Sequence, residues 1–399
     1  PKIYKPTLNK NILTSEIQYF INKNLRTELI TILLKPLNFE DVSNKEIAEQ
    51  IEAKNRCLDK LPTWFGTDNI YYPNKLNIEQ TSSETTAQYK AGIISGTALL
   101  DMTGGFGVDS YFFSLNIGQV HHCEMNMYLS QIAAHNFKVL GRTNIFTHAM
   151  DGIDFLKNSK VEFDWVFIDP SRRNDAKGKV FLLSDCIPNV PDNLDAILSK
   201  AKKIMIKTSP LLDLSAGLRE LHFVKEIHIV AVKNEVKEIL WILEQGYDNE
   251  VLVKTANLGG SEMEKFNFSL DDEKIAHSNY SDPLEYLYEP NSAILKSGAF
   301  KTVGDKFNIY KLHDHSHLYT QNQLLDFPGR RFKVIKTIPF NKKELQRLEL
   351  KKANITIRNF PISVAEIRKK FKIKDGGEIY LFFTTNPKGE KIVVECHKI

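Results

Sequence analysis

A glycine-rich turn directly after an apolar strand is the segment of this chain best suited to chemistry. Leu99 to Ser110 read LLDMTGGFGVDS, in which the apolar run ends at Asp101 and the turn contains Gly104, Gly105 and Gly107. Because glycine has no side chain, such a turn lets backbone N–H groups and the N-terminus of the next helix approach a small ligand. At the carboxyl edge of a parallel sheet, the segment predicts a nucleotide-type pocket.

The spacing of these glycines indicates which nucleotide would bind. The run Gly105-Phe106-Gly107-Val108-Asp109-Ser110 lacks the third glycine of a Gly-x-Gly-x-x-Gly dinucleotide fingerprint, and the chain has no Gly-x-x-x-x-Gly-Lys-Ser/Thr phosphate loop. A carboxylate beside bare backbone suits the ammonium and carboxylate of a methionine moiety better than a pyrophosphate. The turn therefore indicates S-adenosylmethionine. The alternative is a structural turn that holds no ligand.

Two further acids follow the next strands. Glu124 ends the second strand, twenty residues after Gly104, which is the spacing at which a carboxylate accepts hydrogen bonds from both ribose hydroxyls. Its alternative role is that of a surface acid. Met125 is placed to lie against the face of adenine, or in the core. Asp151 follows the third strand and is the candidate acceptor for the exocyclic amine of adenine.

The fourth strand ends in the candidate catalytic residues. Residues 163–173 read FDWVFIDPSRR, an apolar strand that stops at Asp169. Pro170 cannot donate to a strand ladder and directs the following carbonyls into the pocket. We therefore expect the active site here, where Asp169 would polarise an amine and align it behind an activated methyl group.

The elements that position these residues alternate between strand and helix from about residue 95 to 258, which predicts an α/β fold with a parallel sheet covered on both faces. The last two strands are joined by the short turn Lys233–Lys237, so they must form an antiparallel hairpin, because a parallel crossover needs about a dozen residues. Five parallel units closed by a hairpin are typical of class I methyltransferases. The candidate strands are 97–101, 119–124, 144–148, 163–168, 202–207, 225–232 and 238–244.

Four regions are predicted along the chain. Residues 1–90 form a helical N-terminal region, and 91–258 form the sheet domain. Residues 259–325 comprise a polar linker and a small compact module, and 326–399 form an α+β domain. This last region contains 18 Lys and Arg against 8 Asp and Glu. Such an excess of positive charge is expected of a nucleic-acid-binding domain, although a lysine-rich solvated surface would look the same.

Other sequence features bear on location and metals. The four cysteines are widely spaced, and neither a long apolar run nor a signal peptide is present, so we expect a cytoplasmic protein without a membrane segment. The tract His313-Asp314-His315-Ser316-His317 could place three imidazoles on one face of a strand, but no other ligand cluster supports it. No metal site is predicted. The sequence carries no sign of an oligomeric state.

Several motifs together resemble the class I S-adenosylmethionine-dependent methyltransferases. Within them, the chain resembles the bacterial group with a THUMP-like C-terminal domain, which is related to RNA guanine-N2 methyltransferases and trimethylguanosine synthases. The module before that domain is expected to be ferredoxin-like. The motifs are KLPTW (60–64), QTSSETTAQYKA (80–91), DMTGGFG (101–107), DPSRR (169–173), IKTSPLLD (206–213) and EPNSAILKSGAF (289–300).

The resemblance implies roles for named residues. The cofactor would be held by Asp101, Thr103, Gly104, Gly105, Gly107, Glu124 and Asp151, with Glu84 reaching its methionine end. The catalytic segment would be Asp169, Pro170, Ser171 and Arg172. Amino-directed members carry a second proline and an aromatic residue where this chain has Ser171 and Arg172, so Arg172 is a candidate base platform or phosphate anchor. Lys207 would contact a substrate phosphate or lie on the surface.

The leading prediction is thus an enzyme that methylates an exocyclic amine in structured RNA, with guanine N2 as the preferred target. The basic C-terminal region would hold the RNA. One alternative is a methyltransferase that acts on protein or a small molecule. Another is a non-catalytic RNA-binding protein that retains the cofactor pocket.

Overall fold

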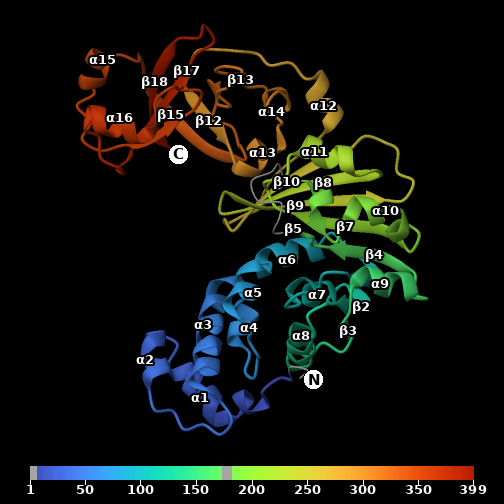
Figure 1. Cartoon of the computed structure of the whole chain (residues 1–399). Helices are drawn as coiled ribbons and strands as arrows, with labels where there is room; N and C mark the ends of the chain where they lie inside the picture. The colour runs from blue at the N-terminus through green and yellow to red at the C-terminus, as the bar shows by residue number, and fades with distance from the viewer. Residues whose placement is uncertain (1–6, 173–181) are drawn as a thin grey trace. The chain divides into compact units, whose positions relative to one another are not determined.

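The computed structural model describes residues 7–172 and 182–399, which divide into two units (Figure 1). Unit 1 comprises residues 1–225 and 239–248, and unit 2 comprises residues 226–238 and 249–399. Each helix in the described ranges is too short or too polar to cross a lipid bilayer.

The sheet of unit 1 has the predicted α/β arrangement. Its strand order is β9-β7-β4-β1-β2-β3, with all neighbours parallel except β7 and β9. Leu99, Val166 and Ile204 are fully buried in its central strands, as expected for a parallel sheet covered on both faces. The strands are β1 (Gly96–Asp101), β2 (Ile117–Cys123), β3 (Ile145–His148), β4 (Phe163–Ile168), β7 (Ala201–Thr208) and β9 (Glu235–Glu244).

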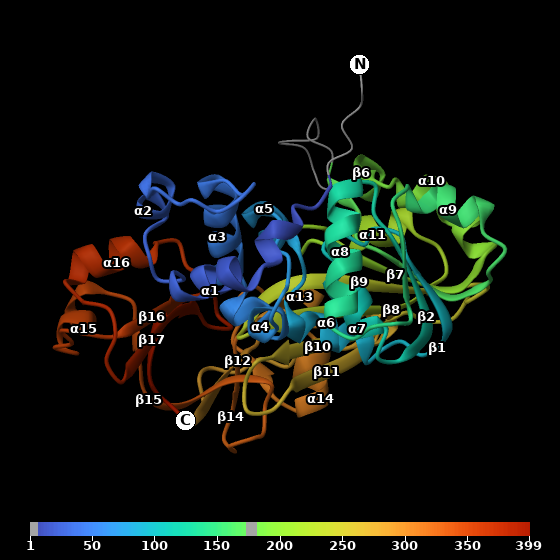
Figure 2. The ribbon, with the colours of Figure 1, turned by 90° about the horizontal axis from the view of Figure 1, so that it is seen from below.

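Helices cover both faces of this sheet. In Figure 2, α7 and α8 lie on one side of the strands, and α9 and α10 lie on the other. The chain winds outward from β1 to β3 and then returns to β4 on the other side of β1. This reversal places a topological switch point at the carboxyl ends of β1 and β4, where ligands bind in such folds. The helices are α7 (Val108–Phe113), α8 (Met127–Val139), α9 (Gly152–Asn158), α10 (Val190–Leu198) and α11 (Leu214–Glu220).

The predicted hairpin is confirmed, although it does not end the sheet. Strand β8 (Val224–Val232) neighbours β9 in the sheet, and the turn between them consists of Lys233 and Asn234. Both turn residues are left-handed, with φ of 50° and 63°. This is the conformation that a two-residue type I′ hairpin turn requires.

The N-terminal region is helical, as predicted, and belongs to unit 1. The longest helix, α3, begins with a capping box formed by Ser43 and Glu46. The segment after α4 docks on α8, because the backbone N–H and C=O of Tyr71 both bond to the Asn136 amide at 2.9 Å. The elements are η1 (Lys10–Leu13), α1 (Ser15–Lys23), α2 (Leu29–Leu34), α3 (Asn44–Lys60), α4 (Pro62–Gly66), α5 (Lys75–Gln80) and α6 (Glu84–Ala91).

The prediction of a linker after residue 258 is wrong. Strand β11 (Glu264–Ser269) pairs antiparallel with β10 (Leu252–Leu258), which is parallel to β8. Phe266 and Phe268 alternate along β11 and are buried, and this alternation stabilises the strand. The polar Gly259–Ser261 run is only the turn between β10 and β11. Helix α12 (Leu270–Ile275) follows.

The rest of unit 2 is built on one seven-stranded sheet. Its order is β13-β14-β12-β15-β18-β17-β16, so the predicted small module and the basic α+β domain share a sheet through the antiparallel pair β12 and β15. The elements are β12 (Tyr286–Pro290), α13 (Ser292–Ser297), α14 (Thr302–Phe307), β13 (Tyr310–Lys311), β14 (Tyr319–Gln321), β15 (Gly329–Pro339), α15 (Lys342–Gln346), β16 (Asn354–Ile357), α16 (Val364–Phe371), β17 (Ile379–Thr385) and β18 (Lys391–Lys398).

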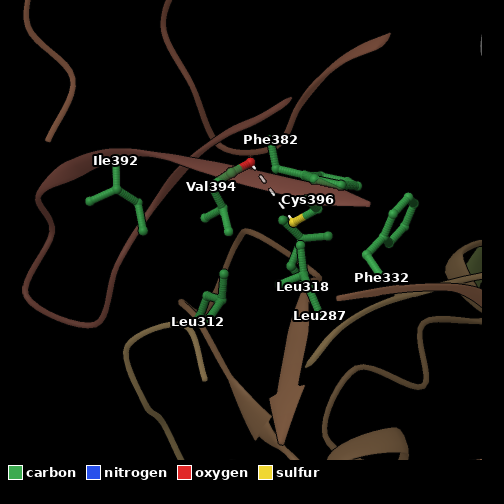
Figure 3. Close-up of a cluster of buried hydrophobic side chains, with 8 residues drawn as sticks. All are labelled: Leu287, Leu312, Leu318, Phe332, Phe382, Ile392, Val394 and Cys396. Carbon is green, nitrogen blue, oxygen red and sulfur yellow. Dashed lines mark hydrogen bonds between the residues drawn. The ribbon is translucent and has the colours of Figure 1, made fainter. Parts of the chain in front are cut away.

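Two apolar clusters form the core of this sheet. One contains Phe332, Phe382 and Val394 with Leu287 of β12 (Figure 3). The other contains Phe383, which packs with residues of α15 and α16. The aromatic side chains of β17 are therefore core residues rather than an exposed surface for stacking bases.

Candidate active site

One cavity of about 520 Å³ lies at the carboxyl ends of the parallel strands of unit 1. A volume of this order is typical of small-molecule sites. Most of the predicted site residues line it. They are Asp101, Thr103, Gly104, Gly105, Glu124, Met125, Asp151, Asp169 and Ser171. Gly107, Pro170, Arg172 and Glu84 do not line it.

Asp101 holds the glycine turn in place from below. Its carboxylate is 1% exposed and accepts hydrogen bonds from the Thr103 N–H at 3.1 Å and the Ser110 hydroxyl at 2.6 Å. The Thr103 hydroxyl in turn accepts from the backbone N–H of Asp169 at 2.7 Å, which fixes the turn against the end of β4. Each oxygen of Asp101 is thus engaged within the protein.

The glycines are required by close packing beneath the turn. A Cβ atom at Gly104 would lie 2.3 Å from Nε2 of His122, and one at Gly107 would lie 2.4 Å from the Phe137 ring. Gly105 and Gly107 also have φ of 56° and 91°. A side chain at these positions would displace the turn.

The two other predicted acids support backbone at the edges of the cavity. Glu124 accepts from the Gly105 N–H at 2.9 Å and from the Asn126 N–H at 2.7 Å. Asp151 caps α9, with its Oδ1 accepting from Ile153 and Asp154. Met125 lines the cavity and is 65% exposed. These carboxylates and the apolar Met125 side chain all line the cavity.

Burial shifts two titratable groups under the turn in opposite directions. Burial, aided by the nearby Asp109 charge, raises the pKa of Asp101 to about 7 against the opposing hydrogen bonds from Ser110 and Thr103. Burial also lowers the pKa of His122 to about 4. The imidazole beneath Gly104 is therefore neutral at physiological pH.

We expect these two groups to change the free energy of unfolding oppositely with pH. Asp101 titrates near 3.8 when unfolded and near 7 when folded, so its stabilising contribution is complete below pH 3.8 and is lost as pH rises to 7. His122 titrates near 6.5 when unfolded and near 4 when folded, so its contribution is complete above pH 6.5 and is lost as pH falls to 4. The two effects oppose each other in the native chain.

Urea unfolding at several pH values tests this pair. The Asp101→Asn variant should gain about 3 kcal/mol of stability, relative to wild type, as pH rises from 4 to 6.5, because each unit of pKa shift corresponds to about 1.4 kcal/mol. The His122→Asn variant should show the reverse slope. Unchanged slopes in both variants would contradict the assignment.

Glu84 is placed elsewhere than predicted. Its carboxylate accepts from the N–H and hydroxyl of Thr63 at 2.6 and 2.8 Å, at the start of α4, and it does not line the cavity. The segment before α6 lines it instead, through Asn77, Gln80, Thr81 and Ser82. The polar run QTSS was the available signal for this wall, but its contact with the cavity depends on tertiary packing.

A buried ion pair fixes this wall. The Lys90 ammonium is fully buried and lies 3.1 Å from Asp109 Oδ1 of α7. Ser82 connects them, because its hydroxyl donates to Asp109 Oδ2 at 2.7 Å and accepts from Lys90 at 3.1 Å. The N-terminal region is thereby attached to the helix that follows the glycine turn.

At the other end of the cavity, Asp169 forms an ion pair with Lys207 at the end of β7. Their side chains are 35% and 15% exposed, and both residues line the cavity with Ser171, Ile187 and Pro188. Pro170 is buried. Arg172 pairs with Cys186 in the short ladder of β5 (Ser171–Arg172) and β6 (Cys186–Ile187), and it does not line the cavity. Residue 173 of the motif lies outside the described residues.

The histidine tract of unit 2 is not a ligand cluster. The His317 ring stacks on Phe300 with centroids 3.7 Å apart, and His313 contacts the Asn359 amide. In the part of the chain that the structure describes, no three His, Cys, Asp or Glu side chains could together hold a metal ion.

The chain is similar to known proteins both in part and over its whole length. Family models match a THUMP domain-like segment at residues 329–398 and a ferredoxin-like domain at residues 286–328. The chain is similar to the crystal structure of a protein from Porphyromonas gingivalis W83 that is named as a candidate methyltransferase. The identity is 32%, the match covers 98% of this chain and 99% of that chain, and the TM-score is 0.86. None of the curated proteins matches the chain.

Two other solved structures resemble part of the chain. M. capricolum TrmK, in complex with S-adenosyl-homocysteine, is 19% identical over 41% of this chain and 70% of its own, with a TM-score of 0.31. The M. jannaschii tRNA m1G37 methyltransferase is 14% identical over 41% of this chain and 50% of its own, with a TM-score of 0.30.

Proposed function

The chain belongs to the S-adenosylmethionine-dependent methyltransferase family with a THUMP-like C-terminal domain, and on this premise we propose that it methylates an exocyclic amine of a base in structured RNA, with guanine N2 as the preferred target. One observation carries the proposal. The Asp169–Lys207 pair shares a single cavity with the glycine turn, Glu124 and Asp151.

The residues of the cavity fit S-adenosylmethionine. Glu124 offers carboxylate oxygens suited to the ribose hydroxyls, and Asp151, which lines the same cavity, would accept from the adenine amine. Met125 supplies apolar contact for the adenine face. The turn at Gly104 and Gly105 and the polar wall from Asn77 to Ser82 surround the space for the methionine end. Asp101 acts through the turn, because both of its oxygens are engaged within the protein.

When bound, the cofactor supplies a methyl group that is already activated by its positively charged sulfur. Asp169 accepts a hydrogen bond from the acceptor amine and so aligns the nitrogen lone pair with that methyl group. On transfer, a nitrogen–carbon bond would replace the carbon–sulfur bond of the cofactor, and the amine would release one proton to solvent. Lys207 keeps the Asp169 carboxylate in place through their ion pair.

Two features support RNA and an amine as the acceptor. A carboxylate accepts hydrogen bonds, so Asp169 suits an N–H donor such as an exocyclic amine. Residues 326–399 carry 18 Lys and Arg against 8 Asp and Glu, which suits a polyanion. The THUMP domain-like match falls on this region.

The test is methyl transfer to RNA. The purified chain is incubated with methyl-labelled S-adenosylmethionine and total RNA from a host strain that lacks the gene, and the RNA is digested to nucleosides. We expect label in a base methylated on its amine, N2-methylguanosine in particular. RNA binding should weaken steeply between about 50 and 200 mM salt, because several phosphate contacts release counterions.

The other outcomes identify the alternatives. Label that enters only protein or small metabolites would replace RNA as the substrate. Label that enters no pool, while RNA still binds, would replace the enzyme with an RNA-binding protein. Label on a ring nitrogen of an RNA base would retain the substrate class and reject the exocyclic amine.

A further inference from the structure

The end of the cavity that contains Asp169 has an apolar rim formed by Ile187 and Pro188. Ile187 is 50% exposed, whereas most side chains of the central parallel strands are buried. Its side chain thus presents exposed apolar surface at the edge of the cavity. The Asp169–Lys207 ion pair lines the same cavity.

Backbone pairing fixes the rim relative to Asp169. Ser171, two residues after Asp169, is the register partner of Ile187 in the β5–β6 ladder. The Ser171 hydroxyl also donates to the Ile187 carbonyl at 3.5 Å. The β5–β6 ladder therefore holds the rim close to the end of β4.

From this arrangement we propose that Ile187, with Pro188, is the platform on which the acceptor nucleobase lies while its amine reaches Asp169. The inference rests on the proposed function and specifies how the acceptor is held. A nucleobase has the two properties that the site requires, which are a flat face that packs on apolar groups and polar N–H groups at its edge. An aliphatic amine would lack the flat face, and a sugar would lack the N–H groups.

The proposal also accounts for the difference between this chain and the amino-directed methyltransferases at Ser171 and Arg172. An aromatic residue three positions after the acid would stack on the base in amino-directed relatives, and this chain has Arg172 at that position. Arg172 pairs with Cys186 and does not line the cavity. The apolar contact would therefore come from β6, across the ladder, rather than from the DPSR segment itself.

Methyl NMR of the whole chain tests the platform without requiring catalysis. The isoleucine δ-methyl groups are ¹³C-labelled, S-adenosyl-homocysteine is added to saturation, and each of the four nucleoside 5′-monophosphates is titrated to millimolar concentration. We expect an upfield ring-current shift of the Ile187 methyl group with at least one nucleotide. Ile30 and Ile275, which are 61% and 72% exposed, are the controls and should not shift. An Ile187 signal unmoved by all four nucleotides would overturn the proposal.

Kinetics provides a second readout. Ile187→Ser should raise the KM for RNA about tenfold and change kcat little, because the lost apolar contact weakens RNA binding by about 1.4 kcal/mol, which corresponds to a tenfold change. Ile187→Phe should keep KM at or below the wild-type value. The control is Leu115→Ser, since Leu115 is 49% exposed and does not line the cavity. An unchanged KM in Ile187→Ser would overturn the platform.

The two proposals fail differently. If the wild-type chain transfers no methyl group to RNA but the Ile187 methyl signal shifts with nucleotides, the RNA methyltransferase proposal fails and the base platform stands. If methyl transfer to RNA occurs but Ile187 neither shifts nor affects KM, the platform alone fails.

Discussion

We expect Asp169→Asn to lower kcat for methyl transfer by about a hundredfold to a thousandfold and to leave the affinity for S-adenosyl-homocysteine unchanged. The range is typical of removing one preorganised electrostatic contact from an active site. Asparagine keeps the size of the side chain but replaces one carboxylate oxygen with a donor, so both the amine contact and the ion pair with Lys207 are weakened. Single-turnover rates and calorimetry measure the two quantities separately.

The chain contains a matched control for this substitution. Asp164 and Lys202 form another ion pair between β4 and β7, at 2.8 Å and at the opposite ends of the same strands. Asp164→Asn removes a carboxylate of the same type from the same strand without touching the cavity. It should leave kcat near the wild-type value. Equal losses in both variants would show that Asp169 acts on the fold and not on the reaction.

Asp101→Ala should weaken the binding of S-adenosyl-homocysteine by about a hundredfold or more. Asp101 accepts hydrogen bonds from Thr103 and Ser110, and leaving a buried donor without its acceptor costs about 1–3 kcal/mol. Losing both releases the turn that supports Gly104 and Gly105. Isothermal calorimetry gives the affinity, and circular dichroism verifies that the variant is folded.

Ser110→Ala is the graded comparison, because it removes one of these two bonds and keeps the carboxylate. Its affinity should fall between those of the wild type and Asp101→Ala. Wild-type affinity in Asp101→Ala would place the cofactor away from the glycine turn and would contradict the proposed pocket.

Much of the sheet and of its polar edge could be predicted from sequence. Parallel strands end at one edge, so an acid after each apolar run is brought to the same place whatever the details of the helices between them. Asp101, Glu124, Asp151 and Asp169 all line one cavity for this reason. The short turn at Lys233 similarly permitted only a hairpin.

The rest depended on contacts between distant residues. Glu84 accepts a hydrogen bond from the N–H of Thr63, 21 residues earlier, at the start of a helix. No local sequence pattern reveals this contact. The polar composition of residues 259–283 predicted an excursion or linker, whereas β11 within this segment is stabilised by pairing with β10. Ile187 carries no motif, and its place at the rim follows only from the β5–β6 ladder.

The buried Lys90–Asp109 pair has a consequence for how this fold can be cut or recombined. A fragment that starts at β1 would leave Asp109 without the Lys90 ammonium and would remove the polar wall that includes Ser82. Breaking a buried pair in this way costs about 3–5 kcal/mol. The Rossmann-like sheet is therefore not expected to be stable when it is moved into another protein by itself. Any chimera or evolutionary domain swap that moves it must carry the preceding helices along.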